Sequence, residues 1–243
     1  MQTALTDPDL SKSLSHVSFA SAVFLGAYLI RRCMKDPNPP SKSSNTGHQK
    51  KDFLMVSGLW LSPAPYRGLF SIFSLAHGLF SLVPEAQRPA LCPNYDPGVS
   101  DDLFHWNTYT AVFLLLLNLS GLLRVLAFWN LKTSFTFRLA RPNHLITTGI
   151  HRYVRHPSYT ALVLNITALL MLFFRHDGLI GCWITSGIIS RAIEVALLFW
   201  GAVITPIWFT VRVQEEETML QETFGKEWEA YCARTKRFLP GVF

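Results

Sequence analysis

Long apolar blocks separated by short polar segments are the feature that most constrains how this chain can fold. The strongest block covers residues 107–130, and others cover 17–30, 66–83, 159–174 and 195–211. A helix of about 20 apolar residues is needed to cross the hydrocarbon core of a bilayer. The blocks therefore predict an all-α, polytopic integral membrane protein with about five transmembrane helices.

The composition agrees with a membrane protein. Hydrophobic residues make up 49% of the chain and charged residues only 16%, whereas soluble domains carry about 25% charged residues. The net charge of +6 would suggest nucleic acid in a soluble protein. Here the basic residues flank apolar blocks, where membrane topology and anionic lipid explain them better, so we expect a lipid environment and no nucleic-acid partner.

The distribution of basic residues predicts how the helices are oriented. Six Lys and Arg residues lie in segment 31–52 and five in 131–157, but only one in 84–104. Because basic segments stay in the cytosol, we expect 31–52, 131–157 and the C-terminal tail to be cytosolic and the N-terminus to be non-cytosolic. Residues 53–62 are too few to cross a bilayer and are interpreted as an interfacial lead-in. Residues 179–190 should lie at the far interface or extend a helix.

Several single features have ordinary interpretations. Arg124 lies inside an apolar block, and snorkelling toward the interface is favoured over a charge facing a cavity. The N-terminus lacks the basic start of a secretory signal, so we expect it to be retained. His151 and His156 are five residues apart without a nearby acid, so no metal site is expected. No disulfide framework and no zinc site are predicted from the four scattered cysteines, and a free thiol is preferred to palmitoylation at Cys33. The cysteines are Cys33, Cys92, Cys182 and Cys232.

Two polar clusters stand where apolar blocks begin or end. The first runs from Asn143 to Tyr159, and the second is Arg212-Val-Gln-Glu-Glu-Glu217. The predicted topology places both on one side of the membrane, joined by a helical hairpin whose ends lie side by side. We therefore expect His156, Tyr159, Arg212 and Glu216 to be neighbours.

The residues alone leave the role of these clusters open. Arg212 and Glu216 share a helix face, which also fits a solvated helix start held by weak surface ion pairs. His156 could be a general base, a hydrogen-bond donor to a ligand or an ordinary interfacial residue. Beyond Glu217, apolar residues at helical spacing predict a cytosolic amphipathic C-terminal helix that Gly225 can bend. These residues are Val213, Leu220, Phe224, Trp228 and Tyr231.

The two clusters together resemble a known family. Arg155-His-Pro-Ser-Tyr159, a hairpin, and then Arg212-x-x-x-Glu-Glu217 with Phe224-Gly-x-x-Trp228 resemble the isoprenylcysteine carboxyl methyltransferase family, whose relatives include the phospholipid N-methyltransferases. The resemblance extends from Asn143 to Pro240. It implies an enzyme region at 132–243, containing a donor-binding segment, the hairpin and the C-terminal helix. Residues 1–52 then form an N-terminal span and polar linker, and 53–131 form membrane spans.

The resemblance implies S-adenosylmethionine as the methyl donor. Glu216 would hold the amino-acid end of the donor, Arg212 would bind the carboxylate of the acceptor, and Tyr159 and His156 would be catalytic. His151 stands where the family often has an aromatic residue. The full set of residues implied to bind the donor is Asn143, His144, Leu145, Ile146, His151, His156, Pro157, Ser158, Tyr159 and Glu216.

The implied reaction forms a methyl ester on the C-terminal carboxylate of prenylated cysteine in client proteins, at the cytosolic face of the endoplasmic reticulum. A carboxylate is ionised at pH 7 and needs alignment rather than a general base. A phospholipid amine or a hydrophobic secondary metabolite is an alternative acceptor, and an amine would need a base. A non-catalytic membrane scaffold is a second alternative, which predicts no donor binding.

Overall fold

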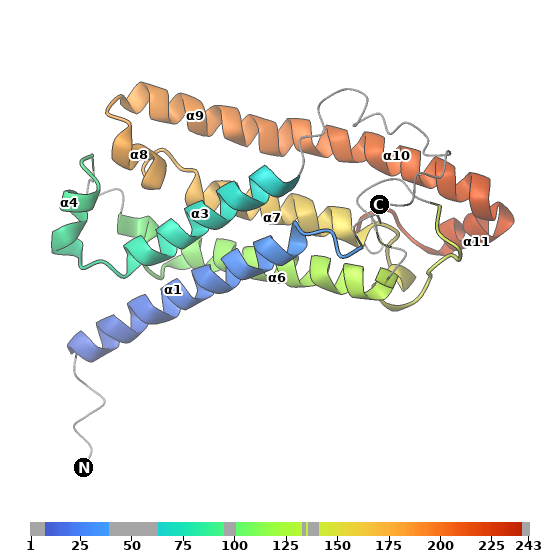
Figure 1. Ribbon diagram of the computed structural model, residues 1–243, viewed down its shortest axis with the longest axis horizontal. Helices are drawn as coiled ribbons and strands as arrows, with labels where there is room; N and C mark the ends of the chain where they lie inside the picture. The colour runs from blue at the N-terminus through green and yellow to red at the C-terminus, as the bar shows by residue number, and fades with distance from the viewer. Residues whose placement is uncertain (1–7, 39–62, 95–100, 133–134, 136–140, 240–243) are drawn as a thin grey trace, which may run out of the picture.

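The computed structural model describes residues 8–38, 63–94, 101–132, 135 and 141–239, and the secondary structure of this part is helical (Figure 1). The expected interfacial lead-in at 53–62 lies outside the described residues. Four long helices pack side by side, and a fifth runs along the length of the molecule. The four are α1 (Pro8–Cys33), α3 (Pro63–Ser81), α6 (Thr108–Leu131) and α7 (Pro157–Phe173).

The fifth long helix is continuous through three elements. They are α9 (Gly187–Phe199), the π-helical turn η5 (Trp200–Ile204) and α10 (Thr205–Phe224). After a break at Gly225, α11 (Lys226–Arg234) turns back toward the bundle. The short elements are η1 (Glu85–Gln87), α4 (Arg88–Leu91), η2 (Asp101–Leu103), η4 (Gly149–Arg152) and α8 (Leu179–Trp183).

The sequence explains where these helices begin and end. Asn107 and Thr110 form a capping box at the start of α6, which satisfies backbone donors that have no helical acceptor. Pro157 occupies the first position of α7, where its missing N–H costs nothing. Gly225 has a φ of 49°, a left-handed conformation that glycine adopts easily, and it separates α10 from α11.

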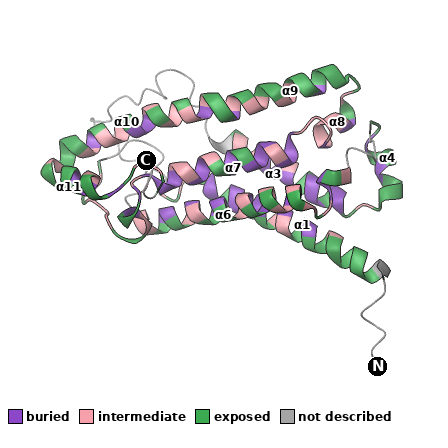
Figure 2. Ribbon diagram, turned by 180° about the vertical axis from the view of Figure 1, so that it is seen from behind, coloured by how far each residue is buried: buried purple, intermediate pink, exposed green. Residues whose placement is uncertain are grey.

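The core lies between α1, α3, α6 and α7. Phe19 and Val23 of α1, Leu117 of α6, and Leu169 and Phe173 of α7 are almost completely buried there. The outward faces are also apolar, and Figure 2 shows exposed residues along most of the α9 helix. Large exposed apolar faces are costly in water but are expected where helices contact lipid.

Among the residues that the structure describes, three helices are long and apolar enough to cross a membrane: Leu10–Cys33, Asp101–Leu131 and Gly187–Phe224. A fourth span is possible if α3 and the bent segment Glu85–Leu91 are taken together. Helix α7 is apolar but has only 17 residues. The all-α membrane fold is confirmed, whereas the count of five spans stays a prediction.

The last apolar block was predicted too short. The helix begins at Gly187 and not at residue 195, because Arg191 and Glu194 lie within it and do not interrupt it. Residues 179–190 were expected to lie at the far interface or to extend a helix. From Gly187 onward they extend the long helix, and before it Leu179–Trp183 form the separate short helix α8.

The prediction of no disulfide framework was wrong. Cys92, which follows α4, is bonded to Cys182 of α8, although 90 residues separate them. No local sequence pattern links two cysteines so far apart, and only the fold brings Cys92 and Cys182 together. Cys33 is a free thiol, as expected, and is fully buried beside the carbonyl oxygen of Gly121.

The snorkelling interpretation of Arg124 was also wrong. Its side chain is only 6% exposed and lies between helices. The guanidinium donates hydrogen bonds to Ser158 of α7 and to the carbonyl oxygen of Cys33. These acceptors compensate the buried charge, so it does not need to reach the interface.

Candidate active site

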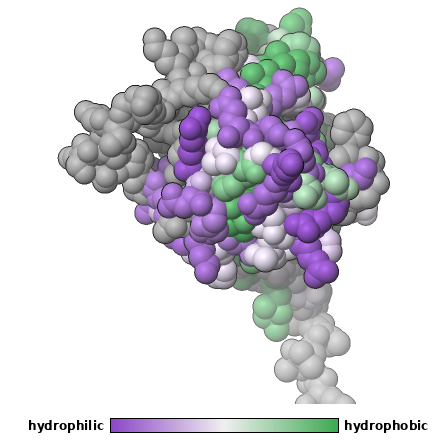
Figure 3. All heavy atoms as spheres, turned by 90° about the vertical axis from the view of Figure 1, so that its right-hand side faces the viewer, coloured by the Kyte–Doolittle hydropathy of each residue, from purple (hydrophilic) through white to green (hydrophobic). Residues whose placement is uncertain are grey.

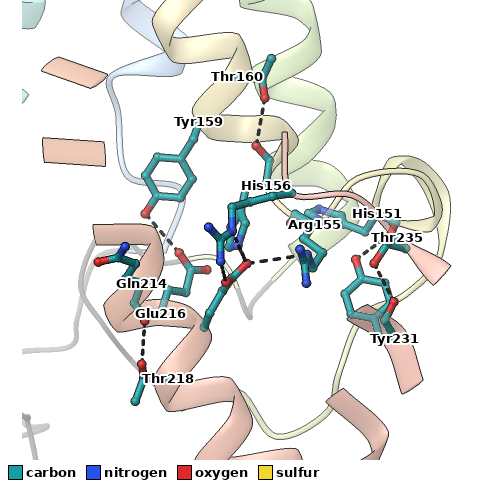
Figure 4. A network of polar contacts seen from close by, with 12 residues as sticks. His151, Arg155, His156, Tyr159, Thr160, Gln214, Glu216, Thr218, Tyr231 and Thr235 are labelled. Atoms are coloured by element: carbon teal, nitrogen blue, oxygen red, sulfur yellow. Dashed lines mark hydrogen bonds and ion pairs between the residues drawn. The ribbon is translucent and has the colours of Figure 1, made fainter. Parts of the chain in front are cut away.

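The two polar clusters meet (Figure 4) at the end of the molecule where α10 and α11 lie (Figure 1). Tyr159, in the first turn of α7, donates a hydrogen bond of 3.1 Å to a carboxylate oxygen of Glu216 in α10. The His156 ring lies 5.8 Å from the Tyr159 ring. Arg212, one turn before Glu216, is 4% exposed and lies beside the Tyr159 hydroxyl. The prediction that these four residues are neighbours is confirmed.

The charged part of α10 extends beyond the membrane. The helix from Gly187 to Phe224 has 38 residues, which corresponds to a length of about 57 Å. The hydrocarbon core is only about 30 Å thick, and the uninterrupted apolar block of this helix ends at Val211, just before Arg212. The site therefore lies at the boundary between membrane and water, and Figure 3 shows that this end of the molecule is mainly hydrophilic.

Glu217, at the end of the second cluster, contacts both the first cluster and the segment around Arg237, a role that the sequence did not reveal. One of its oxygens lies 3.1 Å from His156 Nε2, and the carboxylate accepts two hydrogen bonds from Arg237. Arg155 lies 3.6 Å away as a further ion-pair partner. Burial alone would raise the pKa of Glu217, but the hydrogen bonds from His156 and Arg237 outweigh it and hold the pKa at about 2.

The chain after α11 returns along the segment that leads into α7. Val154 and Lys236 form a parallel bridge, and the N–H groups of Arg155 and His156 donate to the carbonyl oxygens of Lys236 and Arg237 at 2.8 and 3.0 Å. This C-terminal strap, residues 236–238, also accepts a hydrogen bond from Thr160 at the carbonyl of Phe238. The strap therefore fixes the backbone immediately before the site.

Tyr231 of α11 supports the same segment from another side. Its hydroxyl donates a hydrogen bond of 2.6 Å to the carbonyl oxygen of His151, and burial raises the pKa of Tyr231 to about 12. Tyr231 and Trp228 are buried, which accounts for part of the predicted apolar stripe. The cytosolic placement of this C-terminal helix stays a prediction.

His151 carries an unsatisfied polar atom. The ring is 4% exposed, Nδ1 lies 3.3 Å from the carbonyl oxygen of Arg155, and Nε2 is buried without a hydrogen-bond partner among the described residues. Burial lowers the pKa of His151, which favours the neutral form of the ring. Buried polar atoms are nearly always paired, so this atom is suited to a polar group of a ligand.

The remaining predicted residues are placed differently. Asn143 and His144 are exposed, Leu145 and Ile146 are half-buried, and within the described residues no hydrogen bond joins their side chains to Tyr159 or Glu216. Ser158 is buried and its hydroxyl faces Arg124 rather than Glu216. Pro157 begins α7. No cluster of metal-binding side chains is present in the described part of the chain.

Fold and site together define a helical integral membrane protein whose polar site is built from two distant segments, the start of α7 and the charged part of α10. The sequence profile of the isoprenylcysteine carboxyl methyltransferase family matches residues 111–222. The matched region contains α7, α9 and almost all of α6 and α10, and the predicted resemblance to this methyltransferase family is confirmed. A search of curated protein sequences finds no match.

The residues of the site fit the donor that this family implies. S-adenosylmethionine carries a cationic amino group, a carboxylate and ribose hydroxyls. Glu216 offers a carboxylate, and His151 offers a buried ring nitrogen without a hydrogen-bond partner among the described residues. The cationic amino group of the ligand therefore has a partner of complementary charge in the site.

Proposed function

We propose that the protein transfers a methyl group from S-adenosylmethionine to the C-terminal carboxylate of prenylated cysteine in client proteins, forming a methyl ester. The observation that carries this proposal is the buried Arg212 beside the Tyr159–Glu216 pair, at the end of a long lipid-facing helix. A cation buried at the membrane boundary suits an acceptor that is a carboxylate attached to a hydrocarbon chain.

Glu216 and Tyr159 hold the donor from α10 and α7, with Glu216 binding its amino group. The segment before α7 completes the binding site through Asn143, His144, Leu145, Ile146, His151 and Pro157, together with the backbone of Ser158. S-adenosylmethionine, when bound, supplies an electrophilic methyl group on its sulfonium. His156, which is tied to Glu217, shapes the donor site.

Arg212 orients the acceptor carboxylate with its guanidinium, which can bind both oxygens at once. The carboxylate is already ionised at pH 7, so the site needs alignment and exclusion of water rather than a base. The prenyl chain remains in the apolar environment beside the long helix.

We further propose that the site faces the cytosol from the endoplasmic reticulum membrane. The Cys92–Cys182 disulfide lies at the end of the molecule opposite the site (Figure 1). Disulfides persist in oxidising compartments such as the lumen of this organelle. The described parts of the two basic segments, residues 31–38 and 141–157, lie at the same end of the molecule as the site (Figure 1), which agrees with the same orientation.

The test uses membranes that contain the full chain, labelled S-adenosylmethionine and N-acetyl-farnesylcysteine. Base-labile label should form with the wild type and be lost in Arg212→Ala. Arg191→Ala is the matched control, because it makes the same change at an exposed position of the same helix and should leave ester formation intact. Donor binding without any ester would overturn the proposed acceptor.

A further inference from the structure

Arg124 is a buried charge that the proposed chemistry does not use. Its Nη1 donates to both the carbonyl oxygen and the hydroxyl of Ser158, at 2.9 and 2.8 Å, and its Nε donates to the carbonyl oxygen of Cys33 at 3.2 Å. The guanidinium also lies over the ring of Phe128 at 5.1 Å. A charge in the interior of a membrane domain is costly and usually functional.

Two of the hydrogen bonds of Arg124 go to one residue, Ser158, at the start of α7. Ser158 stands between Pro157 and Tyr159 in the first turn of α7. Because one guanidinium nitrogen binds both its carbonyl and its hydroxyl, the position of Ser158 relative to α6 is fixed. The next residue, Tyr159, projects toward α10 and donates to Glu216. The start of α7 is thus held on one side by Arg124 and on the other side by Glu216.

We propose that Arg124 is a positioning residue for the methyl-donor site, an inference that rests on the proposed function. By fixing Ser158, it sets the place at which the Tyr159 hydroxyl meets Glu216. The hydroxyl of Ser158 already accepts a hydrogen bond from Arg124 inside the bundle. Ser158 therefore supports donor binding indirectly, by holding the start of α7 in place, and its hydroxyl does not contact the donor.

The competing explanation is that Arg124 only joins α6 to α7. The molecule contains a suitable comparison, because Asn165 of α7 makes a second polar connection between the same helices. Its Nδ2 donates to the carbonyl oxygen of Leu117 at 3.2 Å and to Ser120 Oγ at 3.1 Å. Asn165 lies about two helical turns from Tyr159 and takes no part in the proposed site. Asn165→Ala therefore removes a buried connection of the same kind at a distance from the donor.

The experiment measures the Kd of labelled S-adenosylmethionine and the Tm for the full chain in lipid nanodiscs. Arg124→Met should raise the donor Kd roughly tenfold, since a displacement of about 1 Å in a site can cost this much or more. Arg124→Lys should restore part of the affinity, because its ammonium can reach Ser158 but not Cys33 as well. Asn165→Ala should lower the Tm to a similar extent and leave the donor Kd within twofold.

Ser158→Ala keeps the proposal testable if Arg124→Met does not fold. Ser158→Ala removes the hydroxyl contact and leaves the carbonyl contact, so a smaller rise in donor Kd is expected. In the double variant with Arg124→Lys, the free-energy loss in donor binding should be less than the sum of the losses in the two single variants. The proposal is overturned if Asn165→Ala raises the donor Kd as much as the Arg124 variants do. It is also overturned if the Arg124 variants bind the donor with the affinity of the wild type. A wild type that binds donor but forms no ester would overturn the proposed acceptor and leave the role of Arg124 standing.

Discussion

The Tyr159 hydroxyl donates a hydrogen bond of 3.1 Å to the Glu216 carboxylate, across 57 residues of sequence. Helix α7 leaves this end of the molecule, and the long helix α9–α10 returns to it. The hairpin thus converts two separate polar clusters into one site at the membrane boundary. The proposed binding of the methyl donor depends on this contact.

Glu216→Gln should weaken donor binding by roughly ten- to a hundredfold, because hydrogen bonds to charged groups contribute about 1.5–3 kcal/mol. The Tyr159 hydroxyl can still donate to the amide oxygen, so the Tm should change little. Titration with labelled S-adenosylmethionine measures the effect. Glu222→Gln on the same helix is the control, since Glu222 forms an exposed ion pair with Arg141 of the kind that contributes little. Equal affinities for both variants would exclude Glu216 from the donor site.

The pH dependence of stability should report on Glu217. Its pKa falls from 4.5 to about 2 on folding, so its contribution is fully present above pH 4.5 and is lost as the pH falls toward 2. Glu217→Gln should therefore unfold at a lower Tm than the wild type at pH 7, and the difference should shrink as the pH falls through this range. Melting curves in detergent micelles between pH 7 and pH 2.5 test this, and a constant difference would contradict it.

The sequence was sufficient for the helical membrane fold and for the convergence of the two clusters. Apolar blocks reveal helices because the bilayer fixes their length, whereas the orientation that the charge bias predicts stays a prediction. A helical hairpin between the two clusters then brings Tyr159 and Glu216 to the same end of the bundle. None of these arguments depends on how side chains pack.

The features that the sequence did not predict all depend on side-chain packing. Arg124 looked like a snorkelling residue because its partners, Ser158 and the carbonyl oxygen of Cys33, come from other helices. Glu217 looked like part of a solvated charge run, yet it binds Arg237 from the C-terminal strap. In each case the pairing is made by the tertiary fold and has no local sequence pattern.

The disulfide provides a prediction at the other end of the molecule. Cys92→Ser should lower the stability by about 2–4 kcal/mol, as loss of a bond closing a long loop does, and Cys92→Ser/Cys182→Ser should be no less stable than the single variant. Thiol labelling of protein from microsomes should modify Cys232 before unfolding and Cys33 only after it, because Cys33 is fully buried. Rapid labelling of Cys92 or Cys182 in the folded protein would contradict the bond.

Gly201 should control how closely the long helix approaches α7. A Cβ at Gly201 would lie 2.2 Å from Cδ1 of Leu170, whereas one at Gly187 meets nothing within 4 Å. Gly201→Ala should therefore lower the free energy of unfolding by about 1–3 kcal/mol through overpacking, and Gly187→Ala should not. The same variant should raise the donor Kd, because α10 carries Glu216. Equal stability of the two variants would show that Leu170 moves aside at no cost.

The acceptor is tested most directly by comparing three substrates in one assay with purified protein in lipid nanodiscs and labelled S-adenosylmethionine. They are N-acetyl-farnesylcysteine, its C-terminal amide and phosphatidylethanolamine. A carboxylate held by Arg212 predicts base-labile label with the first substrate alone, and none in Arg212→Ala. Base-stable label on phosphatidylethanolamine, with none on farnesylcysteine, would contradict the central claim and identify an amine as the acceptor.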